Sequence, residues 1–112
     1  MKLEVKENMY YRTYSGSINK ITSIKDYNER EYLLNGFYIN KDTIKKASYN
    51  IIDILEVGDY VNGRKVVDII YDANDDVMDV CVLGSIVYNN NEVKSVITHE
   101  QMEQMAYKVG NK

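Results

Sequence analysis

The stretch Leu-Glu-Val-Gly-Asp-Tyr-Val-Asn-Gly-Arg-Lys-Val-Val, residues 55–67, decides the fold that the sequence predicts. Asn62-Gly63 lies between two runs rich in valine, and both residues tolerate the positive φ angles of a type I′ turn. The stretch therefore predicts a β-hairpin, with a first strand over 57–61 and a returning strand over 65–71. Its four valines are expected to lie in the core: Val57, Val61, Val66 and Val67.

The same stretch begins a second half that repeats features of the first half. Leu3-Glu4-Val5 recurs 52 residues later as Leu55-Glu56-Val57, and Gly36 recurs 48 residues later as Gly84. A third match, at an offset of about 49, joins two segments that are rich in lysine and β-branched residues, 44–48 and 93–98. Offsets near 50 at three points indicate an internal repeat, and chance recurrence of hairpin-like sequence is the alternative.

The repeat divides the 112 residues into two β-rich halves. We place the N-terminal half at 1–49, and the C-terminal half, which includes a terminal helix, at 50–112. Neither half is expected to fold as an independent domain, because units of this size bury little apolar surface on their own. The predicted fold is mainly β, with two tandem small SH3-like or KOW-like β-barrel halves, each closed enough to hide its edge strands.

The remaining strands are predicted from alternating apolar residues between turn signals. Asn35-Gly36 predicts a second tight hairpin, and the segment 42–55 fits either a helix or a strand. Polar loops are expected at 26–30 and 72–76. The predicted strands outside the 55–67 hairpin cover 9–14, 18–24, 31–34, 37–39, 77–83, 85–88 and 93–97.

A short helix is predicted to begin after Thr98. Thr98 is a good N-cap, and Gln101 three residues later completes a capping box. The apolar residues that follow share one face of this helix, and 110–112 is expected to be a frayed tail. These apolar residues are Met102, Met105, Ala106 and Val109.

Composition excludes several classes of protein. The net charge is −3 and the 14 basic residues are scattered, which argues against a protein that grips duplex nucleic acid. No apolar stretch approaches the 18 or so residues that a membrane span needs, and the single cysteine, Cys81, fits a reducing compartment. We therefore expect a soluble protein in the cytoplasm.

The sequence contains no pattern typical of a catalytic or metal site. The stretch Asp72-x-Asn74-x-Asp76 begins like a calcium loop, but Val77 and Leu83 stand where glycine and glutamate are required. His99 is the only histidine, so a zinc site with Cys81 is not expected, and His99 is predicted to be a surface or capping residue. We expect no enzymatic activity, no metal and no cofactor.

Tyrosines beside cations form the candidate ligand-binding surface. Tyrosine rings can stack on a base while their hydroxyl groups donate hydrogen bonds, and arginine can bind a phosphate or a carboxylate with two hydrogen bonds. Alternation along a strand would bury about half of these rings, so a core role is the alternative. The candidate residues are Tyr10, Tyr11, Arg12, Tyr60, Arg64 and Lys65. A further cationic cluster is Lys41, Lys45 and Lys46, which is expected to be a solvated face.

The chain resembles small uncharacterised proteins of phages and prophages in low-GC Gram-positive bacteria. The segments that carry the resemblance are 9–13 with Gly16, 50–63, 95–103 and 107–110. Small phage proteins of this kind are commonly accessory factors that antagonise host antiviral defence. The resemblance therefore implies a phage-encoded, anti-defence binding protein in the cytoplasm of an infected or lysogenic bacterium.

Two modes of action fit this expectation. The protein could sequester a nucleotide immune signal, which requires a pocket with stacking rings and cations, or it could occlude a defence effector such as a CRISPR nuclease, which requires a large surface. The expected partner is accordingly a host effector protein or a nucleotide second messenger, and homo-oligomerisation is left open. The alternative function is a KOW-like or SH3-like module that docks RNA or protein in phage transcription or assembly.

Overall fold

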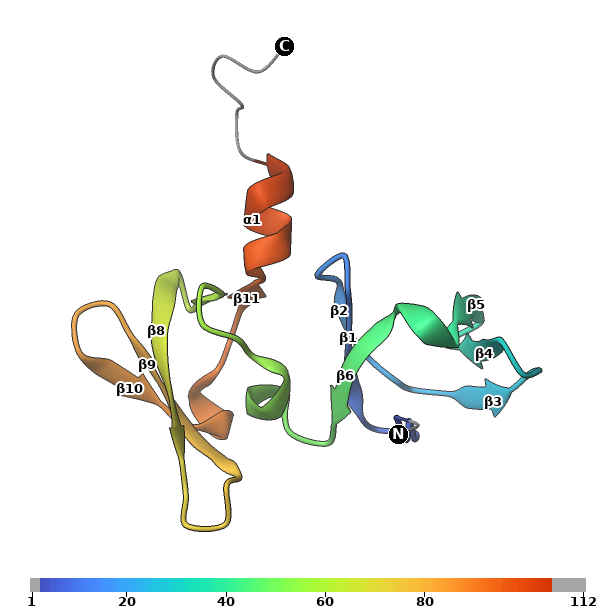
Figure 1. Cartoon of the computed structure of the whole chain (residues 1–112), viewed down its shortest axis with the longest axis horizontal. Coiled ribbons are helices and arrows are strands. Elements are labelled where there is room, and N and C mark those ends of the chain that lie inside the picture. Colours follow the sequence, from blue (N-terminus) through green and yellow to red (C-terminus); the bar gives the residue numbers. More distant parts are fainter. Residues whose placement is uncertain (1–2, 106–112) are drawn as a thin grey trace.

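The computed structural model describes residues 3–105, which form eleven strands, three short 3-10 helices and one α-helix. Figure 1 shows the elements spread over a broad, thin molecule. The strands of the first half are β1 (Tyr10–Thr13), β2 (Ile18–Lys20), β3 (Ile24–Asp26), β4 (Glu31–Leu34), β5 (Phe37–Asn40) and β6 (Ile44–Ser48). The strands of the second half are β7 (Tyr60–Val61), β8 (Arg64–Tyr71), β9 (Val77–Val82), β10 (Ile86–Tyr88) and β11 (Val96–Ile97).

The helices lie between these strands and after them. The 3-10 helix η1 (Lys41–Thr43) precedes β6, η2 (Ile51–Ile54) connects the two halves, and η3 (Asn90–Glu92) comes before β11. The α-helix α1 (His99–Met105) follows β11. The segment 42–55 thus contains both a strand and helical turns. Among the described residues, no helix is long and apolar enough to cross a membrane.

The strands form three antiparallel sheets. The first half contains a sheet with the order β2-β1-β6 and another with the order β3-β4-β5, and the second half contains a single sheet with the order β10-β9-β8-β7-β11. Both predicted hairpin turns are confirmed, because Asn35-Gly36 and Asn62-Gly63 have φ angles between 51° and 85°. In both halves the first strand lies between the second and the last strand.

The turn that precedes the first strand has the same hydrogen bonds in both halves. In the first half, Asn8 N donates to Ile21 O at 2.8 Å, Met9 N donates to Lys6 O at 3.2 Å, and Ile21 N donates to Met9 O at 2.8 Å. Asn8 has a φ of 74°. This turn therefore joins the segment before β1 to the residue that follows β2.

The second half repeats this arrangement at an offset of 50 for the turn residues, with Val66 in the place of Ile21. Gly58 N donates to Val66 O at 2.9 Å, Asp59 N donates to Glu56 O at 3.1 Å, and Val66 N donates to Asp59 O at 2.7 Å. Gly58 has a φ of 100° and occupies the place of Asn8. The two halves thus share a backbone pattern that their side chains share only weakly.

Each half surrounds its own hydrophobic core. The buried residues of one cluster all come from the first half: Val5, Tyr11, Ile21, Leu34 and Ile44. The buried residues of the other cluster all come from the second half: Ile52, Leu55, Val61, Val66, Val80 and Val82. The two clusters lie on either side of residue 50. The division into halves, and the expectation that neither half folds on its own, stay predictions.

Several strand predictions were wrong in their bounds. The strand expected over 18–24 is broken into β2 and β3, because Ile21 turns into the core and bonds to Met9. The strand expected over 57–61 is reduced to β7, since the turn at Gly58 occupies its start. That turn leaves Val57 exposed, and Val67 is exposed as well, so two of the four valines expected in the core lie outside it.

The prediction of a mainly β chain with one short C-terminal helix is confirmed. The prediction that each half closes into a barrel is wrong for the described residues, which form three open sheets. In Figure 1 the β3-β4-β5 sheet extends to one side of the molecule and the β8-β9-β10 strands extend to the other.

Candidate functional site

The largest concentration of charge lies where the two halves meet, and Arg12 is at its centre. Arg12 has no exposed surface, because β1 is the middle strand of its sheet and the second half covers it. Its Nη1 and Nη2 donate to the two oxygens of Asp59 at 2.6 and 2.8 Å, and Nη1 also donates to Ile54 O at 2.9 Å. The bidentate geometry is the strongest arrangement of an arginine and a carboxylate.

Asp59 is fully buried and fully hydrogen-bonded. The repeated turn places its carboxylate beside the start of α1, where it accepts from Glu56 N at 2.7 Å and from His99 N at 2.9 Å. Together with the two bonds from Arg12, these bonds occupy the acceptor capacity of the carboxylate. Asp59 therefore connects β1, the turn before β7 and α1 at one point.

Glu56 pairs with the remaining cations of the interface. Its carboxylate lies 2.9 Å from Lys45 Nζ, 3.1 Å from Lys46 Nζ and 2.7 Å from His99 Nε2. Burial by itself raises the pKa of Glu56, but the hydrogen bonds from His99, Lys45 and Lys46 and the charge of Arg12 outweigh burial and lower the pKa to about 2. Glu56 thus stays ionised throughout the physiological range.

Glu100, in the first turn of α1, completes the network. It accepts from Arg12 Nη2 and, at 3.2 Å, from Lys45 Nζ. Burial raises its pKa, but the hydrogen bond from Arg12 and the other favourable contacts prevail and lower it. The network therefore contains three cations from the first half, Arg12, Lys45 and Lys46, and three carboxylates from the second half, Glu56, Asp59 and Glu100.

Hydrogen bonds between α1 and the β1-β2 turn lie beside this charge network. Thr98 is buried and donates from Oγ1 to Gly16 O at 2.8 Å, while Gln104 Nε2 donates to Ser15 O at 2.9 Å. The predicted capping box is confirmed, because Thr98 N donates to Gln101 Oε1 at 3.1 Å and Gln101 N donates to Thr98 Oγ1 at 3.3 Å. The start of α1 is thereby fixed against the β1-β2 turn.

The network brings together three groups that could in principle bind a metal. One ligand atom from each of Glu56, His99 and Glu100 lies within 4.8 Å of the others. Both carboxylates are, however, already paired with lysine or arginine, and a divalent cation would have to displace these partners. The predicted surface or capping role of His99 is incomplete, because its ring also bonds to Glu56. No sequence spacing would have indicated this grouping.

The structure does not bring the six predicted ligand-binding residues to one place. Tyr11 packs in the core of the first half, and Arg12 is buried in the charge network. Tyr10 lines a cavity of about 290 Å³ with residues such as Ile51 and Val96. Lys20 lies over the ring of Tyr10, with Nζ 5.5 Å from the ring centroid.

The three candidates in the second half lie around the β7-β8 hairpin. Tyr60 and Lys65 line a second cavity, of about 390 Å³, which also includes His99 and Met102. Arg64 is exposed, and its Nη1 approaches Leu83 O at 3.4 Å. Ligand binding by these residues stays a prediction. Burial of Tyr11 and Arg12 nevertheless means that they would not be free to contact a ligand.

The lysine cluster at 41–46 is not a simple solvated face. Lys41 Nζ bonds to Asp26 at 2.7 Å and lies 4.7 Å from the centroid of the Tyr32 ring. Lys45 and Lys46 bind Glu56, as described above. All three ammonium groups therefore have partners inside the chain.

The sequence prediction missed an exposed aromatic group on the β3-β4-β5 sheet. Tyr38 lies opposite Leu33 in the β4-β5 pair, and Leu33 lies opposite Lys25 in the β3-β4 pair, so these side chains share one face. On the same face, the rings of Tyr27 and Tyr38 meet edge to face at 4.8 Å. Tyr27 and Tyr38 are 50% and 58% exposed, and Phe37 is 71% exposed at the start of β5. We call this face, with Lys25, Tyr27, Leu33 and Tyr38, the outer face.

No protein-family model, curated protein or solved structure matches the chain. The resemblance to phage and prophage proteins therefore stays a prediction.

Proposed function

We propose that this chain is a non-enzymatic binding protein that occludes the surface of a protein partner through the outer face. The observation that carries the proposal is the exposed pair Tyr27–Tyr38 on an open sheet. Tyrosine is enriched at protein interfaces, because its ring buries a large apolar area while its hydroxyl group retains a hydrogen bond. Tyr38 lies on strand β5 and Tyr27 directly follows β3, and two rings that already contact each other lose less side-chain freedom on binding.

Occlusion is favoured over capture of a nucleotide. A phosphate site needs accessible cations beside its stacking rings, whereas Arg12 is buried against Asp59, and Lys45 and Lys46 are paired with Glu56. The same pairing weakens the alternative of an RNA-docking surface built on Lys41, Lys45 and Lys46. Among the six candidate residues only Arg64 and Lys65 remain as exposed cations, so the two modes that need several free cations are less well supported than a contact between proteins.

We also propose that each half is an open, diverged unit of the SH3-like or KOW-like class. Support comes from the shared strand order, in which the last strand lies beside the first and a 3-10 helix precedes the last strand. The hydrogen bonds around Asn8 and Gly58 recur in both halves. In this proposal the charge network holds the two units in one orientation, so that the protein presents a fixed surface.

The biological role that we propose is antagonism of a host defence effector, such as a CRISPR nuclease, inside an infected bacterium. The test is phage plating on hosts that carry one defence system each and express the chain. Tyr38→Ala and Tyr27→Ala are compared with Tyr71→Ala, whose ring has a similar exposure on the other half.

We expect the unchanged chain and Tyr71→Ala to restore plating in at least one host, and the two outer-face variants to fail although they remain folded. Equal rescue by all variants would contradict occlusion through the outer face. A thermal-shift screen with cyclic dinucleotides and ADP-ribose derivatives tests sequestration. A ligand at 100 times its Kd would raise the free energy of unfolding by about 2.7 kcal/mol, and such a shift would favour the rival mode.

A further inference from the structure

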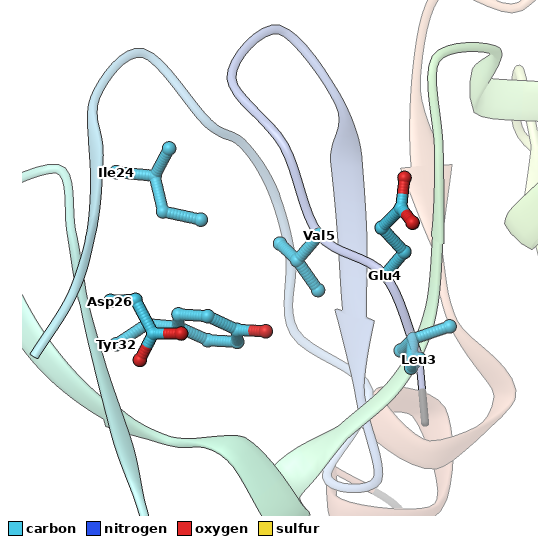
Figure 2. Close-up of a pocket in the computed structure, with 6 residues that line it drawn as sticks. All are labelled: Leu3, Glu4, Val5, Ile24, Asp26 and Tyr32. Atoms are coloured by element: carbon cyan, nitrogen blue, oxygen red, sulfur yellow. The ribbon is translucent and has the colours of Figure 1, made fainter. Parts of the chain in front are cut away.

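We infer that a hollow beneath the β3-β4-β5 sheet binds an arginine side chain of the protein partner. Figure 2 shows this hollow between the N-terminal segment and strands β3 and β4. Its volume is about 420 Å³, within the range of roughly 300–1,000 Å³ that is usual for ligand sites. The inference deepens the proposed function and rests on it, because it names the chemistry that the partner must present.

The walls of the hollow are apolar. They consist of Val5, which belongs to the core of the first half, together with Ile24 from β3, Leu3 and the ring of Tyr32 from β4. The strand register places Ile24, Asp26 and Tyr32 on the face opposite Tyr38, so the hollow and the outer face lie on the two sides of one sheet. An arginine side chain has three methylene groups that can pack against such walls.

The polar groups at the rim of the hollow favour a cationic ligand. Figure 2 shows the Tyr32 hydroxyl directed into the hollow, with the Asp26 carboxylate in front of the ring. Glu4 lies on the other side. The carboxylates of Glu4 and Asp26 each use one oxygen, for Lys6 at 2.8 Å and for Lys41 at 2.7 Å, and both side chains are more than two-thirds exposed. The Lys6–Glu4 pair is exposed on both sides and is worth only about 0–1 kcal/mol, so an arginine can displace Lys6. Lys41 is largely buried, so an arginine would share Asp26 with it through the second carboxylate oxygen.

The charge around the hollow favours a positive ligand. A neighbouring cavity of about 240 Å³ shares Leu3, Val5 and Tyr32 with the hollow. The two cavities together are lined by four carboxylates and one cation: Glu4, Asp26, Glu29, Asp42 and Lys41. Clefts lined by one sign of charge concentrate ions of the opposite sign.

One cation of the chain already binds in this way. Lys41 Nζ lies 4.7 Å from the centroid of the Tyr32 ring and pairs with Asp26. The same ring and carboxylate can therefore hold a cation by stacking and ion pairing. Arginine fits better than lysine, because its planar guanidinium carries five donors, stacks on aromatic rings and is more weakly hydrated.

The test uses the isolated chain labelled with ¹⁵N and titrated with N-acetyl-arginine methylamide. We expect the amide signals of Val5, Ile24 and Tyr32 to shift in a saturable way. The lysine derivative should bind more weakly, and the uncharged norvaline derivative should cause no saturable shift. Asp26→Asn should weaken binding by about two- to fivefold, as expected for the loss of one exposed charge pair, and Tyr32→Phe should weaken it by removing the hydroxyl group. Asp76→Asn, in the exposed loop of the other half, is the matched control and should leave binding unchanged.

Absence of a saturable shift, equal binding of the norvaline or lysine derivative, or the same effect from Asp76→Asn would overturn the inference. The titration tests the hollow and the plating assay tests the outer face, so one proposal can fail without the other. Loss of plating in Tyr38→Ala without a response to arginine would refute only the hollow. A response to arginine with full plating in Tyr38→Ala would refute occlusion through the outer face and leave the hollow as a site.

Discussion

Replacement of Asp59 by asparagine is expected to be one of the most destabilising single changes in this protein. Asp59→Asn preserves the shape of the side chain but removes the negative charge that two arginine nitrogens approach within 2.8 Å. It also places a donor where one of the backbone N–H groups of Glu56 and His99 now finds an acceptor. Arg12 would then remain buried with a deficit of opposing charge.

The magnitude follows from the burial of both partners. Arg12 and Asp59 have no exposed surface, and removal of one partner of a buried ion pair typically costs about 3–5 kcal/mol. Glu100 and Glu56 remain near Arg12, the latter at 3.6 Å, which compensates a part of the loss. We therefore expect a loss of about 3 kcal/mol. For comparison, the total stability of a small domain is about 5–15 kcal/mol.

The assay is urea denaturation followed by circular dichroism, applied to Asp59→Asn, Arg12→Met and the double variant. We expect the double variant to lose less than the sum of the two single losses, with a coupling of about 1–3 kcal/mol, because its core contains no unpaired charge. Lys65→Met, an exposed change in the second half, should have little effect. A loss below about 1 kcal/mol in Asp59→Asn, or strict additivity, would refute the claim that this ion pair joins the halves.

Three further predictions concern the same interface. The Glu56 carboxyl has a pKa of about 2 in the folded protein and a reference pKa of 4.5, so it adds about 3 kcal/mol to the free energy of unfolding above pH 4.5. This contribution is lost as the pH falls towards 2. Glu56→Gln should therefore flatten the loss of stability in this range, as measured by urea titrations at several pH values. Gly16→Ala should lower the melting temperature more than Gly63→Ala. Both glycines have positive φ angles, but only a Cβ at position 16 would collide with Thr98 Oγ1 and, at 2.7 Å, with Glu100 Cβ. Thr98→Ala should lower the free energy of unfolding by about 1–2 kcal/mol through the lost cap and the lost bond to Gly16, whereas an unchanged melting temperature would show that the start of α1 contributes nothing.

Local signals in the sequence were sufficient for the turns and the cap. A tight hairpin turn needs positive φ angles, and few residue pairs tolerate them as well as Asn35-Gly36 and Asn62-Gly63 do. Both hairpins could therefore be placed correctly. Thr98 and Gln101 are three residues apart, and the capping box that they form depends on that spacing alone. The prediction of α1 beyond residue 105, including Ala106, Val109 and the tail at 110–112, lies outside the described residues.

Contacts between the halves could not be predicted, because they join residues that are far apart in sequence. Arg12 was expected to be free to bind a ligand, since a cation beside tyrosines in a short strand is usually exposed. Its partner Asp59 lies 47 positions away, in a segment that was predicted to be a strand and forms a turn instead. The internal repeat stays a prediction, but Asn8 and Gly58 share a backbone role, at an offset of 50, that their side chains conceal.

The outer face was missed for a related reason. Alternation predicts which residues of a strand share a face, but it does not tell which face the rest of the protein covers. Leu33 and Tyr38 look like core residues in a short hairpin, and only the open arrangement of the three sheets leaves Tyr38 exposed. Tyr27, in the loop after β3, completes the pair through a contact that no local pattern indicates.

The most direct measurement of the proposed function is site-specific photocrosslinking inside an infected host. Benzoylphenylalanine is placed at Tyr38 or at Tyr71, two tyrosines with exposures of 58% and 57% on different halves. We predict that a host protein crosslinks to position 38 and not to position 71, and that the crosslink disappears when Tyr27 is also replaced by alanine. A crosslink from position 71 alone, or equal crosslinks from both positions, would contradict the claim that the protein acts through the outer face of the β3-β4-β5 sheet.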